Sequence, residues 1–192
     1  FRIKHLGIAR RTDAGIELRV HPTLIPDDQL IANVNGVKNA VLVQANAVGP
    51  TLYYGAGAGA GPTASAVVAD VVDIVRDIIY TEDGAGTIPQ LAFEALTDLP
   101  ILTREQMTTG YYIRINAEDQ MGVLADVTTI LSRAGISIDA IMQQPRLKDL
   151  IPIVILTDPI VESKMDEALK QIQALPFIHG EIVRIRLESL DN

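Results

Sequence analysis

Glycine occupies every second position from residue 55 to residue 61, and a proline and a threonine follow directly: Gly55, Gly57, Gly59, Gly61, Pro62 and Thr63. Because glycine has no side chain and tolerates positive φ, such a run leaves the backbone open to close approach by a ligand. Pro62 favours the first turn of a helix, where unpaired N–H groups and the peptide dipoles suit an anionic or polar partner. The run is therefore a candidate cofactor loop.

The spacing of Gly55, Gly57 and Ala60 satisfies the dinucleotide-binding fingerprint, but the sequence that follows does not. That fingerprint requires a strand, a helix and a second strand that ends in an acidic residue. Here the helical pattern continues from Pro62 to about Tyr80, and two acidic residues follow with no strand between. We therefore reject a Rossmann fold for this segment. A glycine-rich connection that binds no ligand is the alternative.

Composition excludes several classes of partner and site. The chain has 192 residues, of which 48% are hydrophobic, enough to bury a core in one or two domains. Its 16 basic and 24 acidic residues give a net charge of −8, which argues against nucleic acid and membrane surfaces as partners. The chain has no cysteine, and its three histidines lack metal-ligand spacing, so we expect no metal site. Without an apolar span or a secretory signal, the expected localisation is cytoplasmic.

Strand patterns dominate the first part of the chain. Residues 16–21 alternate apolar and polar side chains, as expected for a strand with one buried face, and residues 2–10 are its expected partner. Residues 40–44 and 51–54 form a second expected pair. This part is therefore predicted to be an antiparallel or mixed sheet.

A helix follows, and then the periodicity stops. From Pro62 to about Tyr80 the apolar residues recur at helical spacing. We therefore predict a first domain at residues 1–80 and a linker at residues 81–108. The chain begins without methionine, inside its first expected strand, so we infer a piece of a longer protein.

The second predicted domain, residues 109–192, shows the order strand, helix, strand, strand, helix, strand. This is the plan of a ferredoxin-like βαββαβ fold, so the whole chain is predicted to be α+β. The expected elements lie at residues 111–116, 123–134, 136–142, 151–156, 163–172 and 181–187. Ser163 and Asp166 have the spacing of a capping box and are predicted to start the second helix.

The segment Asn116–Val127, followed by Arg133–Ile138, resembles the ACT domain, a ferredoxin-like module that binds amino acids. The resemblance extends over about residues 109–189. It implies an effector site formed by Asp119, Gly122, Val123 and Ser137. Gly122 would allow close approach, and the first helix turn would offer N–H groups to a carboxylate. Ala117 stands where ligand-binding members carry a polar side chain, and a module that only pairs subunits is the alternative.

Four blocks of the first part resemble the end of the catalytic domain of homoserine dehydrogenase: Leu6–Arg10, Gly15–Pro26, Asn35–Val41 and Tyr54–Val68. The blocks occur in the family's order and precede an ACT domain, which makes them specific as a set. The resemblance covers nearly the whole chain but only the C-terminal half of the enzyme. It implies an NAD- or NADP-dependent oxidoreductase of threonine, methionine and isoleucine biosynthesis, which interconverts aspartate semialdehyde and homoserine.

The resemblance also implies which residues meet the cofactor. The residue that matches Gly59 lies against the bound nucleotide, and Gly57, Gly61 and Thr63 complete the expected cofactor-binding set. The family's catalytic lysine and aspartates lie upstream of Phe1, so we expect no catalytic residue in this chain and no activity from the chain alone. Expected partners are a small-molecule substrate, an amino-acid effector such as threonine, and further copies in a homodimer or homotetramer. A stand-alone module that senses an amino acid and pairs subunits is the alternative function.

Overall fold

The computed structural model describes residues 1–80, 96–145 and 150–190. The chain forms two compact units, Phe1–Ala32 with Leu99–Asn192, and Asn33–Asp98. This grouping differs from the predicted division at residues 80 and 109, because the first hairpin packs with the second half of the chain. The division into family domains stays a prediction, and residues 81–95 of the predicted linker lie outside the described residues.

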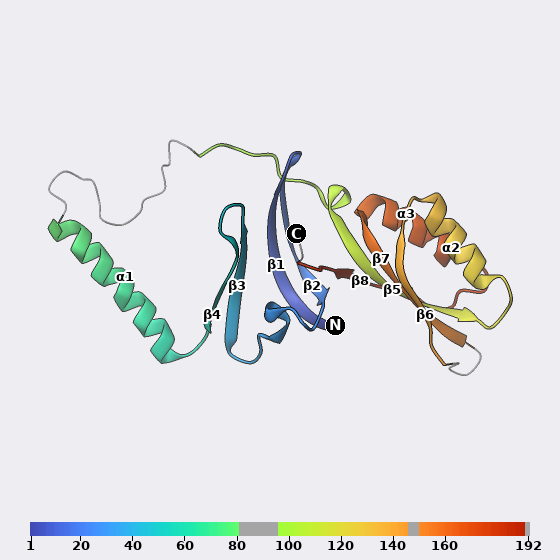
Figure 1. Cartoon of the computed structure of the whole chain (residues 1–192), viewed down its shortest axis with the longest axis horizontal. Coiled ribbons are helices and arrows are strands. Elements are labelled where there is room, and N and C mark those ends of the chain that lie inside the picture. Colours follow the sequence, from blue (N-terminus) through green and yellow to red (C-terminus); the bar gives the residue numbers. More distant parts are fainter. Residues whose placement is uncertain (81–95, 146–149, 191–192) are drawn as a thin grey trace. The chain divides into compact units, whose positions relative to one another are not determined.

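The second half of the chain forms a ferredoxin-like module, as the sequence predicts. Its elements are β5 (Thr108–Glu118), α2 (Val123–Arg133), β6 (Ile138–Gln143), β7 (Leu150–Val161), α3 (Glu162–Gln173) and β8 (Val183–Leu187). The strands pair antiparallel in the order β8-β5-β7-β6, and both helices cover the same face of the sheet (Figure 1). Between sheet and helices lies an apolar core, whose fully buried members include Ile113, Leu131, Ile155, Met165 and Ile172.

A hairpin from the start of the chain extends this sheet. β1 (Arg2–Thr12) and β2 (Gly15–Ile25) pair antiparallel along their whole length. β2 then pairs in parallel with β8, which gives a six-stranded sheet in the order β1-β2-β8-β5-β7-β6. The predicted pairing of the first two strands is therefore confirmed. Their attachment to β8 was not predicted, because register between distant strands leaves no local signal in the sequence.

β2 has one buried face, as its alternation predicts, but in this chain the buried face is the polar one. Glu17, Arg19 and His21 are all at least nine-tenths buried, whereas Leu18 and Val20 are 46% and 72% exposed. Burial of charged side chains is favourable only when they are paired and hydrogen-bonded. Arg19 is paired with Glu188, far along the chain, which the alternation of residues 16–21 cannot reveal. Glu17 contacts Arg19 itself, and His21 contacts its neighbours Pro22 and Thr23.

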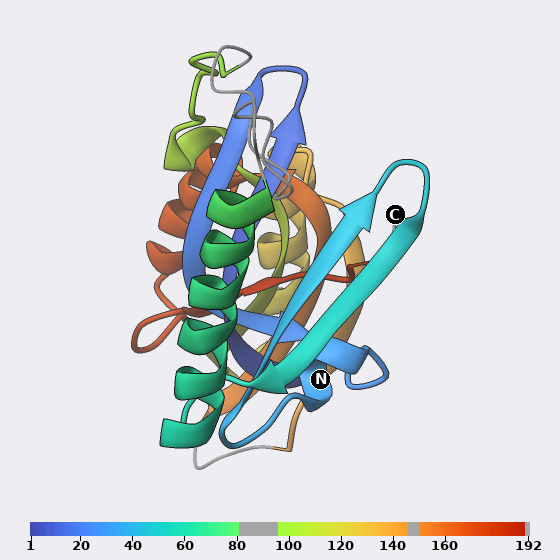
Figure 2. The same cartoon turned by 90° about the vertical axis from the view of Figure 1, so that its left-hand side faces the viewer.

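The unit Asn33–Asp98 contains a second hairpin and the longest helix among the described residues (Figure 2). β3 (Lys38–Ala45) and β4 (Gly49–Ala56) pair antiparallel as a separate two-stranded sheet, and α1 spans Ala60–Tyr80. These elements were predicted. The prediction that the second hairpin joins the first in one sheet was wrong. Within this chain the apolar side chains of α1 remain exposed: Val67, Val68, Val71, Val72, Ile74, Val75, Ile78 and Ile79.

Two features of the helices bear on earlier expectations. Among the described residues, none of the helices is apolar over a bilayer's thickness, and α1 carries Asp70, Asp73, Arg76 and Asp77.

The predicted capping box of α3 was wrong. The helix begins at Glu162 after Val161, which makes no side-chain cap, and Asp166 instead binds two arginines.

Candidate functional site

The glycine run connects β4 to α1. Gly59 has φ = +122°, a conformation that residues with a Cβ rarely adopt, and its carbonyl accepts the amide of Thr63 at 3.1 Å. The chain therefore turns at Gly59 directly into the first turn of the helix. Gly59 and Gly61 are both exposed, although a Cβ at Gly59 would lie 3.3 Å from the Cδ atom of Pro62.

The remaining predicted cofactor residues differ in their surroundings. A Cβ at Gly57 would lie 1.2 Å from the Nδ2 atom of Asn39. The backbone amide of Gly57 donates to the Val37 carbonyl at 3.0 Å. A Cβ at Gly61 would meet no atom within 4 Å. The absence of a side chain at Gly57 is therefore explained by packing against β3, whereas Gly61 leaves room for a ligand.

In the ferredoxin-like module, Gly122 precedes α2 in the left-handed conformation, with φ = +93°. Its carbonyl accepts the amide of Asp126 at 2.9 Å, and Val123 turns its side chain into the core. A Cβ at Gly122 would meet no atom within 4 Å, so the turn is open. The first amides of a helix have no partner within the helix, and they lie at the positive end of the peptide dipoles.

The sheet brings together only some of the predicted effector residues. Asp119 follows β5 directly, close to Gly122 and Val123 in the chain. Ser137 directly precedes β6. The first residue of β6 pairs with Thr157, and Thr157 also pairs with Tyr111, near the start of β5 and far from Asp119. Because a strand rises about 3.4 Å per residue, Ser137 and Asp119 lie roughly 24 Å apart at opposite ends of the sheet. The length of α2, about 16 Å, separates Ser137 from Gly122 and Val123. One copy of the chain therefore does not assemble all four residues.

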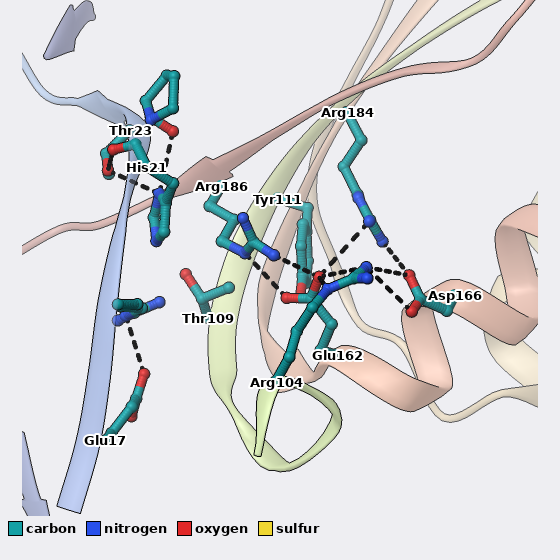
Figure 3. Close-up of polar contacts among 12 residues, drawn as sticks. Glu17, His21, Thr23, Arg104, Thr109, Tyr111, Glu162, Asp166, Arg184 and Arg186 are labelled. Carbon is teal, nitrogen blue, oxygen red and sulfur yellow. Dashed lines mark hydrogen bonds and ion pairs between the residues drawn. The ribbon is translucent and has the colours of Figure 1, made fainter. Parts of the chain in front are cut away.

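A cluster of charged side chains surrounds Glu162, the fully buried first residue of α3 (Figure 3). Its carboxylate accepts hydrogen bonds from the Tyr111 hydroxyl at 2.8 Å, from Arg186 Nε at 2.9 Å and from Arg104 Nε at 3.0 Å. Asp166, one turn further along α3, binds Arg104 and Arg184. We call these six residues the Glu162 cluster: Arg104, Tyr111, Glu162, Asp166, Arg184 and Arg186.

The contacts within the Glu162 cluster keep the Glu162 carboxylate ionised and paired with arginines. Burial by itself would raise the pKa of Glu162, but hydrogen bonds from Arg186 and Tyr111 and the charge of Arg186 outweigh it and lower the pKa to about 2. Burial and the contact with Glu162 raise the pKa of the Tyr111 hydroxyl. At neutral pH the carboxylate is therefore ionised and the phenol protonated. The cluster links α3 to β5 and β8 and has no group that is ready to exchange a proton.

A second buried cluster lies where the first hairpin meets β8. Glu188 binds Arg19 of β2 and Arg10 of β1, the latter at 3.1 Å, and lies 3.1 Å from the Thr109 hydroxyl of β5. Glu17 completes the group through a 2.9 Å contact between its Oε1 atom and Arg19 Nε. We call Arg10, Glu17, Arg19, Thr109 and Glu188 the Glu188 cluster.

Sequence reasoning missed both clusters. A signal was present in β2, where charged residues alternate at every second position, but the same alternation also fits a solvated face. The histidines carry no site: His21 is buried with Nδ1 3.0 Å from the Pro22 carbonyl, and burial lowers its pKa. Among the described residues no group of histidine and carboxylate side chains could hold a metal ion.

Comparison with known proteins identifies two family segments. Residues 1–72 match the family model for homoserine dehydrogenase, and residues 111–174 match the model for the ACT domain. The first match contains the glycine connection up to α1 and most of that helix. The second contains the Gly122 turn and the core of the ferredoxin-like module.

Relatives of known identity are similar over the whole chain. A homoserine dehydrogenase of Pseudomonas aeruginosa is 54% identical over 100% of this chain, and one of Neisseria gonorrhoeae is 48% identical over 99%. The crystal structure of a homoserine dehydrogenase from Thiobacillus denitrificans matches 99% of the chain with a TM-score of 0.88 and 54% identity. The chain spans 44% of the length of the first two relatives and 43% of the third. The chain therefore belongs to the homoserine dehydrogenase family and carries that family's segment together with an ACT domain.

Proposed function

We propose that this chain forms part of a homoserine dehydrogenase, which interconverts L-aspartate 4-semialdehyde and L-homoserine with NAD(P)H. The observation that carries the proposal is the exposed backbone at Gly59 and Gly61, at the start of α1 and inside the matched family segment. A bound nicotinamide cofactor supplies the hydride. This chain's contribution is to let the cofactor approach the backbone and to offer the amides of the first helix turn.

The residues present fit such a cofactor. Gly59 adopts a φ that disfavours a side chain, and Gly61 has open space where a Cβ would stand. The Thr63 amide is used by the Gly59 carbonyl, so the amides of Ala60 and Gly61 are the ones left to meet a polar ligand. We assign Gly59 and Gly61 to cofactor contact and Gly57 to the support of the connection.

A direct assay tests the activity. The longer protein that contains this chain is assayed with homoserine and either nicotinamide cofactor, beside the chain of 192 residues alone. We expect turnover from the longer protein and none from the chain alone, because positioning groups without the rest of the site cannot transfer a hydride. An inactive longer protein that still binds amino acids would favour the alternative function, a module that only senses an amino acid.

We further propose that the ACT domain binds an amino-acid effector, L-threonine, at a site shared by two copies. Gly122 and the first turn of α2 would receive the carboxylate, and Asp119 would receive the ammonium group. Ser137 lies too far away in the same chain, so it would come from the second copy. The supporting observation is the open left-handed turn at Gly122.

Calorimetric titration tests effector binding. Threonine is titrated into the chain, and serine, isoleucine and methionine serve as competitors. We expect heat with threonine and its loss in Gly122→Asp, which would place a negative charge where the carboxylate binds. The absence of heat with all four amino acids in a folded dimer would leave the ACT domain as an assembly device.

A further inference from the structure

The seam between the first hairpin and the ferredoxin-like module is short. β2 and β8 pair only at Thr23–Arg186 and Leu24–Leu187, and the Glu188 amide adds one bond to the Leu24 carbonyl at 3.0 Å. At the other end of β2, Ile16 makes two backbone hydrogen bonds, to Pro100 and Leu102 of the segment that precedes β5. By contrast, β1 and β2 pair from one end to the other, and β5 and β7 pair along nearly their whole length. A backbone ladder this short contributes little resistance to separation.

No residue of the hairpin belongs to the module's apolar core. All residues of that core, and the partly buried residues packed against it, come from positions 111–182. The hairpin instead presents Glu17, Arg19 and His21 to the module. The contact between the two bodies is therefore polar along Glu17, Arg19 and His21 and apolar only at the end of β2, where Leu24 and Ile25 are buried. Each body is held together by its own ladders or by its own core.

The polar contact is incompletely satisfied. Arg19 Nη1 and His21 Nε2 are buried and have no hydrogen-bond partner among the described residues. The close pair of Arg19 Nε and Glu17 Oε1 lacks the alignment of a hydrogen bond. Buried ion pairs with unsatisfied atoms add specificity but little net stability. We therefore expect the seam to open at a lower free energy than the bodies on either side.

Within the Glu188 cluster, Glu188 is the carboxylate that connects the hairpin to the module. Its oxygens bind Arg10 of β1 and Arg19 of β2, and they lie beside Thr109 at the start of β5. We propose that the seam between β2 and β8 is a hinge between the hairpin and the ACT domain, and that Glu188 is the latch that holds it closed.

The hinge has a use in regulation, and that part rests on the proposed effector function. β5 contacts the latch through Thr109 at its start, and the turn of Asp119 and Gly122 follows its end. One strand thus joins the proposed effector site to the latch. Binding of threonine would then change how often the seam opens.

Amide hydrogen exchange of the chain tests the hinge. In the wild type we expect the amide of Glu188, which donates across the seam to the Leu24 carbonyl, to exchange at least about tenfold faster than those of Ile113 and Ile155 in the core ladder. Glu188→Gln should accelerate exchange at the seam by about tenfold more and leave the core ladder within about twofold. Arg10→Gln, which removes only a half-exposed partner, should act in the same direction with a smaller effect. Glu118→Gln, at the far end of β5, is the matched control and should change neither.

Several outcomes would overturn the hinge. Equal acceleration of seam and core would mean that the hairpin and the module open as one body, and an unchanged seam in Glu188→Gln would remove the latch. Threonine should slow or accelerate seam exchange at least threefold in the wild type and not in Glu188→Gln. If threonine binds with heat but leaves the seam unchanged, the regulatory use fails. If threonine produces no heat, the proposed effector function fails, while the exchange data without threonine still decide the hinge.

Discussion

Glu162 shows how a buried charge can be stable when its partners are fixed. Its side chain is fully buried, yet three donors from β5, β8 and the segment before β5 reach its oxygens. Because the pKa of Glu162 falls to about 2 in the folded state, its ionised form contributes to stability above the ordinary value of 4.5. That contribution is lost as the pH falls from about 4.5 toward 2.

This linkage predicts a pH dependence of unfolding. Between pH 5 and pH 2, the free energy of unfolding should fall by about 3 kcal/mol more in the wild type than in Glu162→Gln, which has no charge to protonate. At pH 7 the variant itself should be less stable, because it leaves the partly buried Arg186 with a weakened partner. Denaturant titrations at both pH values measure the difference. Glu167→Gln, which replaces an exposed carboxylate on α3, is the control and should retain the wild-type slope. Parallel pH curves for all three proteins would contradict the prediction.

Gly59 is the residue on which the cofactor proposal depends most directly. In the longer, active protein, Gly59→Val should raise the cofactor KM or lower kcat by more than about tenfold, because a β-branched side chain would meet the ligand and resist the positive φ. Gly49→Val is the matched control, since Gly49 also has a positive φ and open space around it. Both variants should lose stability, but only the first should lose cofactor affinity. Equal kinetics in two folded variants would reduce the glycine run to a turn.

At the level of elements, the turn between β1 and β2 is fixed by a close approach of two backbones. Gly15 has φ = +143°, and a Cβ there would lie 2.2 Å from the Pro100 carbonyl oxygen. The next amide, that of Ile16, donates to the same carbonyl at 2.8 Å. The hairpin is thus held against the segment that leads into β5.

Gly15→Ala should therefore destabilise the unit by more than about 2 kcal/mol, because neither backbone can move without breaking this bond. Gly180→Ala, at a positive φ with nothing near its Cβ, should cost only about 1 kcal/mol. Thermal or denaturant unfolding of the two variants gives the comparison. Similar losses for both would mean that the approach of Pro100 is easily relieved.

The elements themselves were largely predictable, and their pairing across long distances was not. Alternation and helical spacing located both hairpins, α1 and the order of the ferredoxin-like module, because these periods are local properties of the sequence. The burial of Arg19 and the attachment of β2 to β8 depend on Glu188, far along the chain. Ser163 and Asp166 had the spacing of a cap, but arginines compete more strongly for the Asp166 carboxylate.

At the level of the whole molecule, the proposed effector site needs two copies of the chain. Gly122→Asp removes one half of the site, and Ser137→Arg removes the other half. In a dimer formed by both variants, one site combines the two intact halves and the second site combines the two altered halves. Random mixing should therefore restore about a quarter of the wild-type binding sites.

Titration with threonine before and after subunit exchange measures this recovery. Each variant alone should give no binding heat. If the site lay within one copy, mixing would restore nothing. Recovery after mixing would place Ser137 opposite Gly122 of another subunit.

The sharing of β8 between two bodies has a consequence for any attempt to isolate the ACT domain. β8 is bordered by β5 on one side and by β2 on the other. A protein trimmed to begin at Thr108 would keep the first border and lose the second, which would leave the edge of β8 that faces β2 without a strand partner. Unpaired edges of this kind recruit strands from neighbouring molecules and lead to aggregation. A soluble regulatory domain therefore requires the first hairpin to be retained, joined to the module by a designed connection.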